Sequence, residues 1–139
     1  MIELEVGTEG EASRVVQTSD LASELSDGHS GTFPAVFSTS RLVALMELAS
    51  ARALLPVLGP GQLSVGVTVS ITHTAATAPG ARVRATARFT GQQGKFYAFE
   101  VAAFDPAGEI GKGTHLRAVI DAERLIRGAD NRARREDPS

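Results

Sequence analysis

The sequence predicts an α+β fold in which an antiparallel β-sheet wraps around one largely buried helix. Two periodicities support this prediction. Apolar residues recur at helical spacing between residues 38 and 55, and they alternate with polar residues in several segments after residue 62. Gly- and Pro-rich turns separate the alternating segments, which favours antiparallel neighbours. Packing a helix layer on a sheet buries both apolar surfaces.

The predicted helix spans residues 38–55. It follows a Ser-Thr-Ser capping signal and stops before Pro56. Helical spacing assigns to its core face Leu42, Leu45, Met46, Ala49 and Ala53. Small and apolar residues such as Val43 and Leu54 cover much of the remaining surface, so we expect a largely buried helix.

Five strands are expected, in the order strand, helix, then four strands in a meander. They lie near residues 12–17, 63–71, 81–89, 95–104 and 109–120. The strand after the helix has the clearest alternation, and its apolar set continues by twos to His73; we expect this face to cover the helix. The hot-dog architecture, a sheet wrapped around a helix, is the economical solution. Element order and composition alone also leave open a small barrel or a cystatin-like fold.

The chain of 139 residues is predicted to form one domain over residues 1–126, followed by a charged, frayed tail over 127–139. Hydrophobic residues make up 42% and charged residues 22%, as in globular proteins with a packed core. The chain has no cysteine, which excludes a disulfide framework, a thiolate nucleophile and a Cys-based zinc site.

Charge and hydropathy also limit location and partners. The amino terminus is acidic without a following apolar run, and no segment reaches the ~20 apolar residues of a membrane span, so we expect a cytoplasmic protein that does not bind membranes. The sequence contains no nucleic-acid-binding motif, so we expect no nucleic acid among its partners. From residue 28 to 99 there are six basic residues and one carboxylate, Glu47, which suits an anionic ligand. Three of the basic residues lie on one strand face, where they either bind that anion or form a solvated surface: Arg82, Arg84 and Arg88.

Three residues could carry chemistry. Glu47 lies near the middle of the predicted buried helix, where an unpaired carboxylate is costly, and Arg41 and Arg52 lack the favoured spacing to pair with it. A partner must therefore come from elsewhere in the fold, unless Glu47 faces solvent. His73, on the face predicted to cover the helix, could form a proton-transfer pair with Glu47. Thr39 lies in the first helical turn, where it either caps the helix or contacts a substrate.

The segments FPAVFSTSRLVALMELASARALLP, LSVGVTVSITHTAATAPG and EIGKGTHLRAVI strongly resemble the fluoroacetyl-CoA thioesterase-like family of hot-dog-fold thioesterases. The resemblance covers residues 33–120. It implies hydrolysis of a short acyl-CoA by a Thr, a Glu and a His, which fall on Thr39, Glu47 and His73. In this family Glu47 would act as nucleophile or general base, His73 would carry the proton, and Thr39 would orient the carboxylate or polarise the carbonyl.

The same resemblance implies substrate contacts at Gly66, Arg117 and Phe33, the last being the aromatic residue that closes over the acyl pocket. It also implies a homodimer and a reaction that needs no metal. No separate cofactor is expected, because coenzyme A is part of the substrate. The lid departs from the family pattern. Ser30 replaces a second lid phenylalanine, and residues 20–31 form a shorter, more polar segment, which argues against strict fluoroacetyl specificity.

Two other functions remain open at this stage. A hot-dog hydratase or dehydratase would carry an Asp and a His close together on one loop, but His73 is followed by Thr74, Ala75 and Ala76 with no nearby Asp. A non-catalytic acyl-CoA binding module would have lost the catalytic set that this chain retains. Release of free thiol from acetyl-CoA distinguishes a hydrolase from both.

Overall fold

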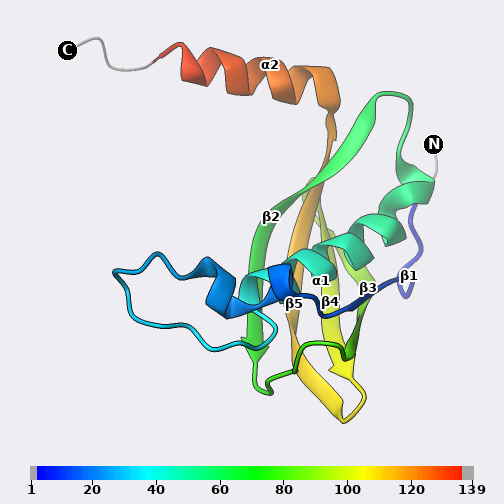
Figure 1. The fold of residues 1–139 in the computed structure, drawn as a ribbon. Helices are drawn as coiled ribbons and strands as arrows, with labels where there is room; N and C mark the ends of the chain where they lie inside the picture. Colours follow the sequence, from blue (N-terminus) through cyan, green and yellow to red (C-terminus); the bar gives the residue numbers. More distant parts are fainter. Residues whose placement is uncertain (1–2, 136–139) are drawn as a thin grey trace.

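A computed structural model describes residues 3–135 and shows a five-stranded antiparallel sheet curled around helix α1, Thr39–Leu54 (Figure 1). The strands are β1 (Glu9–Val15), β2 (Gln62–His73), β3 (Arg82–Gln93), β4 (Phe96–Asp105) and β5 (Gly108–Asp121). Three short 3-10 helices cover Thr18–Asp20, Ala22–Leu25 and Leu55–Val57, and helix α2 covers Ala122–Ala133. The sheet order is β1-β3-β4-β5-β2. The predicted hot-dog architecture is confirmed.

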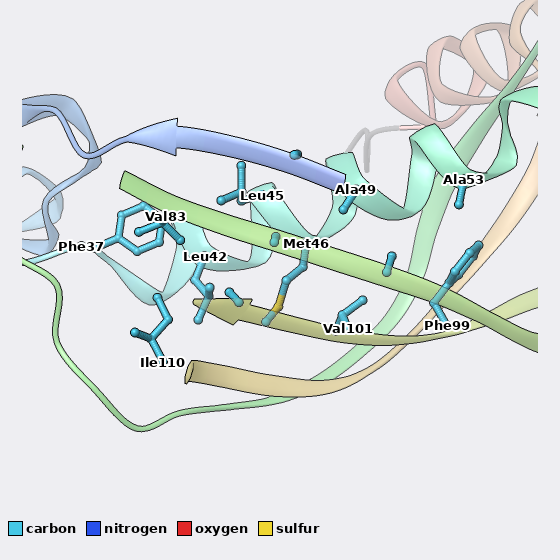
Figure 2. Close-up of a cluster of buried hydrophobic side chains, with 14 of the residues drawn as sticks. Phe37, Leu42, Leu45, Met46, Ala49, Ala53, Val83, Phe99, Val101 and Ile110 are labelled. Atoms are coloured by element: carbon cyan, nitrogen blue, oxygen red, sulfur yellow. The ribbon is translucent and has the colours of Figure 1, made fainter. Parts of the chain in front are cut away.

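Helix α1 packs against the inner face of the sheet through the face that its periodicity predicts. Ser38 caps the helix by accepting a hydrogen bond from the backbone N–H of Arg41 at 3.2 Å. The five residues assigned to the core face are all buried, and they meet inward side chains of β3, β4 and β5 (Figure 2). The opposite helix face, which includes Ala44 and Leu48, is exposed, so the prediction of a largely buried helix holds for only one side.

The prediction that one continuous apolar face of β2 covers the helix is wrong. The β2–β5 register shifts between Gly66 and Thr68, and this bulge exchanges the two faces of the strand. Ile71 and His73 consequently lie on the inner side, whereas Leu63 is half exposed on the outer side. Alternation in the sequence does not reveal the extra residue that inverts it.

The predicted four-strand meander is only partly correct. Tight turns connect β3 to β4 and β4 to β5, but β2 does not pair with β3. The segment 74–81 instead crosses the end of the sheet, and β2 pairs with β5 at the edge. Thr77 holds this crossover in place, because its Oγ1 donates to Asp105 Oδ2 at 2.8 Å and its carbonyl accepts from the Phe37 N–H at 2.9 Å.

The carboxyl-terminal segment also differs from expectation. Residues 127–133, predicted to fray, continue helix α2, which extends away from the sheet (Figure 1). Asp121 caps this helix by accepting from the Arg124 N–H at 3.1 Å. None of its residues is buried, so its apolar side chains Leu125 and Ile126 are exposed and pack against no core within residues 3–135. The last four residues of the predicted tail lie outside the described part of the chain. Within residues 3–135, no helix is both long and apolar enough to cross a membrane.

Candidate active site

Thr39 and His73, 34 residues apart in the sequence, meet where α1 begins and β2 ends. Thr39 Oγ1 lies 2.8 Å from His73 Nδ1, which is a hydrogen bond. His73 Nε2 is buried and has no hydrogen-bond partner among residues 3–135. Burial lowers the pKa of His73 below its ordinary value, and the nearby Ala75 backbone partly opposes this. The imidazole is therefore neutral at pH 7 and able to accept a proton.

A pocket of about 360 Å³ opens beside this pair. It is lined by Ala22, Pro34, Val36, Phe37, Ser38, Thr39, His73, Thr74, Ala75 and Ala76. Most of these groups are apolar or backbone, and the polar side chains are those of Ser38, Thr39, His73 and Thr74. Sequence reasoning did not assign Phe37, which is buried behind the pocket, although its place in the FPAVF segment beside the helix start was a signal. The dimensions suit a small acyl group.

Glu47 lies two turns further along α1 and pairs with Arg117 of β5. Arg117 Nη1 donates to Glu47 Oε2 at 3.3 Å. The same guanidinium donates from Nε to Ser64 Oγ at 3.0 Å and from Nη2 to the Ser64 carbonyl at 2.9 Å. The prediction that Glu47 finds its partner elsewhere in the fold is confirmed. Arg117 was predicted to contact substrate, and here it holds the carboxylate.

The two arginines nearest to Glu47 in the sequence serve other contacts. Arg41 lies 3.8 Å from Asp20, and Arg52 donates to the Glu11 carbonyl at 2.8 Å. Neither arginine pairs with Glu47 among the described contacts.

His115 completes the surroundings of Glu47, and sequence reasoning missed it. Its Nδ1 lies 2.7 Å from the Thr68 carbonyl, and its Nε2 lies 3.1 Å from Arg117 Nη1. Gly66 leaves room beside this group: a Cβ there would lie 3.3 Å from His115 Cε1 and 3.4 Å from Glu47 Oε2. The glycine therefore lets the β2 backbone approach the carboxylate closely. The only sequence signal for His115 was its spacing of two residues from Arg117.

Within one chain the predicted catalytic set forms two separate groups. Thr39 and His73 form one group, and Glu47 with Arg117 and His115 forms the other. Eight residues of helix separate Thr39 from Glu47, about 12 Å at 1.5 Å per residue. Among residues 3–135, no hydrogen bond or salt bridge joins Glu47 to Thr39 or His73. The same residues contain no group of three or more His, Asp or Glu side chains that could hold a metal ion.

The lid residues lie outside these two groups. Phe33 is exposed, and its N–H donates to Ser26 Oγ at 3.1 Å. It does not line the pocket, so the predicted closure over the acyl group is not formed in this conformation. Ser30 takes part in a turn around Asp27, to which it donates from both its N–H, at 2.8 Å, and its Oγ, at 2.9 Å.

The three arginines of β3 lie far from either group. They point outward from a strand that is separated from β2 by β4 and β5. Arg82 donates to Ser13 Oγ at 3.1 Å, and Arg84 lies 3.6 Å from Glu11 and 5.0 Å from the centre of the Phe104 ring. Two of the three therefore make contacts within the chain.

Comparison with solved structures identifies the class of protein to which this fold belongs. A member of the thioesterase superfamily from Thermus thermophilus is 28% identical and superimposes with a TM-score of 0.85, covering 98% of this chain and 100% of that one. A hot-dog-like protein from Thermanaerovibrio acidaminovorans, 24% identical, matches with a TM-score of 0.77 over 91% of each chain. The protein has the hot-dog fold of the thioesterase superfamily.

Sequence comparisons specify the family. The model of the fluoroacetyl-CoA-specific thioesterase family, FlK, matches residues 16–123. A fluoroacetyl-CoA thioesterase of Streptantibioticus cattleyicolor is 48% identical over 93 residues, 67% of each chain. A structure of the fluoroacetyl-CoA thioesterase FlK superimposes with a TM-score of 0.84 at 37% identity, covering 99% of this chain and 100% of that one. The chain belongs to the FlK family and is an acyl-CoA thioesterase. This assignment favours hydrolysis over hydration or binding alone.

Proposed function

We propose that this enzyme hydrolyses short acyl-CoA thioesters with Thr39, Glu47 and His73 as catalytic residues. The observation that carries the proposal is the hydrogen bond between Thr39 and His73 beside a small pocket, with the imidazole nitrogen Nε2 unpaired among the described residues. Glu47, oriented by Arg117, supplies the carboxylate. These side chains are sufficient for the reaction, and coenzyme A enters only as part of the substrate.

In the proposed reaction, water adds to the thioester carbonyl carbon, the C–S bond breaks, and a carboxylic acid and free coenzyme A result. Glu47 acts either as the base that takes the proton from water or as a nucleophile whose acyl adduct water then hydrolyses. His73 transfers the proton that the leaving thiolate needs, and Thr39 orients the carboxylate or polarises the carbonyl. Backbone N–H groups at the start of α1 or at the β2 bulge would stabilise the oxyanion.

This chemistry requires both groups of residues to meet, and we propose that a homodimer brings them together. Strand β2 is an edge strand of 12 residues that contains no Asp, Glu, Lys or Arg, and it exposes Val67 and Val69. A long edge with exposed apolar side chains and unpaired backbone groups is a template for pairing with a strand of another chain. The α1 face around Glu47 also exposes Leu48, by 44% of its surface.

Antiparallel pairing of two β2 edges about a two-fold axis would complete the site. With the axis between Val69 and Ser70, positions 66 and 73 are equidistant from it, so Gly66 of one protomer would lie opposite His73 of the partner subunit. Glu47, which is next to Gly66, would then face the Thr39–His73 pair of the partner. Each dimer would contain two such composite sites.

Mixed dimers test both the reaction and the composite site. Glu47→Gln and His73→Ala chains carrying different tags are co-expressed, and the heterodimer is purified and assayed for thiol release from acetyl-CoA. One of its two sites would be intact, so we expect about half of wild-type activity from two nearly inactive parents. If each site lay within one chain, both sites would be damaged and no activity would return.

The acyl group is proposed to be short and not restricted to fluoroacetyl. A mutant of FlK has been solved in complex with fluoroacetate and CoA, but the lid of this chain presents Ser30 in a turn around Asp27. A panel of short acyl-CoAs that includes fluoroacetyl-CoA tests this proposal.

We also propose that the enzyme acts in the cytoplasm, where acyl-CoA substrates are available, and fractionation of cells producing the tagged chain tests that location.

A further inference from the structure

His115 is a buried histidine with no assigned role in the reaction described above. Only 2% of its surface is exposed, and it lies on the inner face of β5 between strands β2 and β4. The charged groups that face it are Arg117 of β5 and Glu47 of α1. The neighbouring strands contribute uncharged groups, namely Gly66 and the Thr68 carbonyl from β2 and Phe99 from β4.

The partners of the two ring nitrogens define its tautomer. The Thr68 carbonyl can only accept a hydrogen bond, so Nδ1 must carry a proton. Arg117 Nη1 can only donate, so Nε2 must present its lone pair. Only the neutral Nδ1–H imidazole satisfies both contacts. Burial, as the largest cause, lowers the pKa of His115, and the Arg117 charge lowers it further, whereas the Thr68 hydrogen bond and the Glu47 charge oppose this.

We propose that His115 is a positioning residue for catalysis, which orients Arg117 and, through it, the Glu47 carboxylate. A continuous series of hydrogen bonds runs from the Thr68 carbonyl through His115 and Arg117 to Glu47. These hydrogen bonds begin at the β2 bulge. The position of the Glu47 carboxylate therefore depends on the position of the edge-strand backbone. This inference rests on the proposed role of Glu47.

The series also predicts a second acid-sensitive group. Protonation of His115 would place an N–H on Nε2, directed at the Arg117 cation 3.1 Å away. Two donors and two positive charges would then face each other, so Arg117 would move and Glu47 would lose its orientation. Activity would thus be lost at low pH by protonation of His115 as well as of His73.

Two substitutions separate the contacts of His115. His115→Gln retains an acceptor near the position of Nε2 and cannot titrate, whereas His115→Asn retains a donor near Nδ1 and leaves Arg117 without its acceptor. We expect kcat for acetyl-CoA to fall about 10- to 100-fold in His115→Asn, with KM little changed, and only about 5-fold or less in His115→Gln. Val101→Ala, a cavity variant in the core of β4, is the control for lost stability, and its kcat should not change.

The pH profile and the tautomer provide readouts that a purely structural role would not affect. At low pH, within the range where the circular dichroism spectrum remains native, log kcat should fall with a slope approaching about 2 in the wild type and about 1 in His115→Gln. Nitrogen-15 NMR of the histidine rings should show the Nδ1–H tautomer for His115, identified by its absence in His115→Gln.

The proposal is overturned if folded His115→Asn retains wild-type kcat, if the two pH profiles coincide, or if NMR shows the Nε2–H tautomer. A wild-type enzyme that releases no thiol from any acyl-CoA would overturn the proposed function instead. The tautomer measurement does not depend on activity and distinguishes the two failures.

Discussion

Glu47 owes its orientation to a cation that has almost no contact with water. The Arg117 side chain is 6% exposed and that of Glu47 is 43% exposed, so the carboxylate reaches the surface while its partner stays inside. Arg117 also makes two hydrogen bonds to Ser64 and one to His115, which prevents it from following the carboxylate as it moves. For the role proposed for Glu47, a fixed donor beside the carboxylate would be a preorganised arrangement.

Replacing Glu47 by Gln tests this residue directly. The substitution preserves shape and removes the charge, so we expect kcat to fall by at least ~10²-fold with little change in melting temperature. Thiol release measured with a thiol-reactive dye and a thermal melt provide the two values. Turnover near the wild-type level would exclude Glu47 as base or nucleophile.

Gly66→Ala tests the close approach of β2 to the carboxylate. The added Cβ would lie 3.3 Å from His115 and 3.4 Å from Glu47, so the His115 ring must shift by a few tenths of an ångström while Glu47 comes into van der Waals contact. We expect kcat to fall about 10-fold, because small displacements of reacting groups are costly. Gly128→Ala, at an open position of helix α2, is the matched control and should leave kcat unchanged. Equal activity of the two variants would show that the space beside Gly66 is not needed.

At the scale of elements, β1 and α1 approach so closely that their contact permits no side chain at Gly10. A Cβ there would lie 2.0 Å from the Ala49 carbonyl oxygen and 2.7 Å from the Ala53 backbone nitrogen. Backbone atoms cannot rotate away as a side chain can, so the strand and the helix must separate. We expect Gly10→Ala to lower the free energy of unfolding by about 3 kcal/mol or more, measured by urea denaturation. A loss below about 1 kcal/mol would mean that β1 shifts freely over the helix.

The lid is the element that should set selectivity. Asp27 organises it locally, since hydrogen bonds from the His29 and Ser30 N–H groups and from the Ser30 hydroxyl lower the pKa of its carboxyl group. A polar turn stands where the resemblance to the family predicts a large aromatic side chain, whose burial would contribute about 1.5–3 kcal/mol. Recognition of one small substituent is worth a similar ~1–3 kcal/mol.

We therefore expect a preference for fluoroacetyl-CoA over acetyl-CoA, measured as the ratio of kcat/KM values, well below ~10⁴. Ser30→Phe should raise that ratio by up to about 10-fold, whereas Ser30→Ala, which removes only the hydroxyl group, should not. A wild-type ratio above ~10⁴ would show that selectivity lies in the catalytic residues and not in the lid.

The whole molecule should lose stability as the pH falls, because both histidines of the site have lowered pKa values when folded. At high pH they are neutral in both states. Below their ordinary value of 6.5 the unfolded chain binds protons that the folded chain resists, so the free energy of unfolding decreases. We expect the melting temperature to fall between about pH 6.5 and 5, and to fall less in His115→Gln. A melting temperature independent of pH over this interval would contradict the burial of these rings.

Asp20 affects the free energy of unfolding in a lower pH range than the two histidines. Burial opposes its charge, but hydrogen bonds from Arg14 and from the Gln17 N–H, with the charges of Arg14 and Arg41, outweigh burial and lower its pKa. Its contribution to stability is present above its ordinary value of 3.8 and is lost only as the pH falls below that value.

Short-range patterns in the sequence predicted the elements and most of the core. Residues three and four apart on α1, and two apart on β3, identified their buried faces because a single turn or pleat determines which neighbours share a side. The FPAVFSTSRLVALMELAS, THTAAT and GTHLRAV segments pointed to the family, and the first two pointed to Thr39, Glu47 and His73 as candidate residues, whose roles remain predictions.

Only the tertiary structure decided how these parts meet. The bulge after Gly66 inverts β2, and the crossover at 74–81 carries the chain from β2, at one edge of the sheet, to β3 beside β1. Arg117, 70 residues from Glu47, became its partner, and His115 became buried beside both. Periodicity records which side of an element is apolar. The packing of the whole chain decides which distant strand lies against that side and which buried charges then pair. The sequence pattern of a single element does not contain this information.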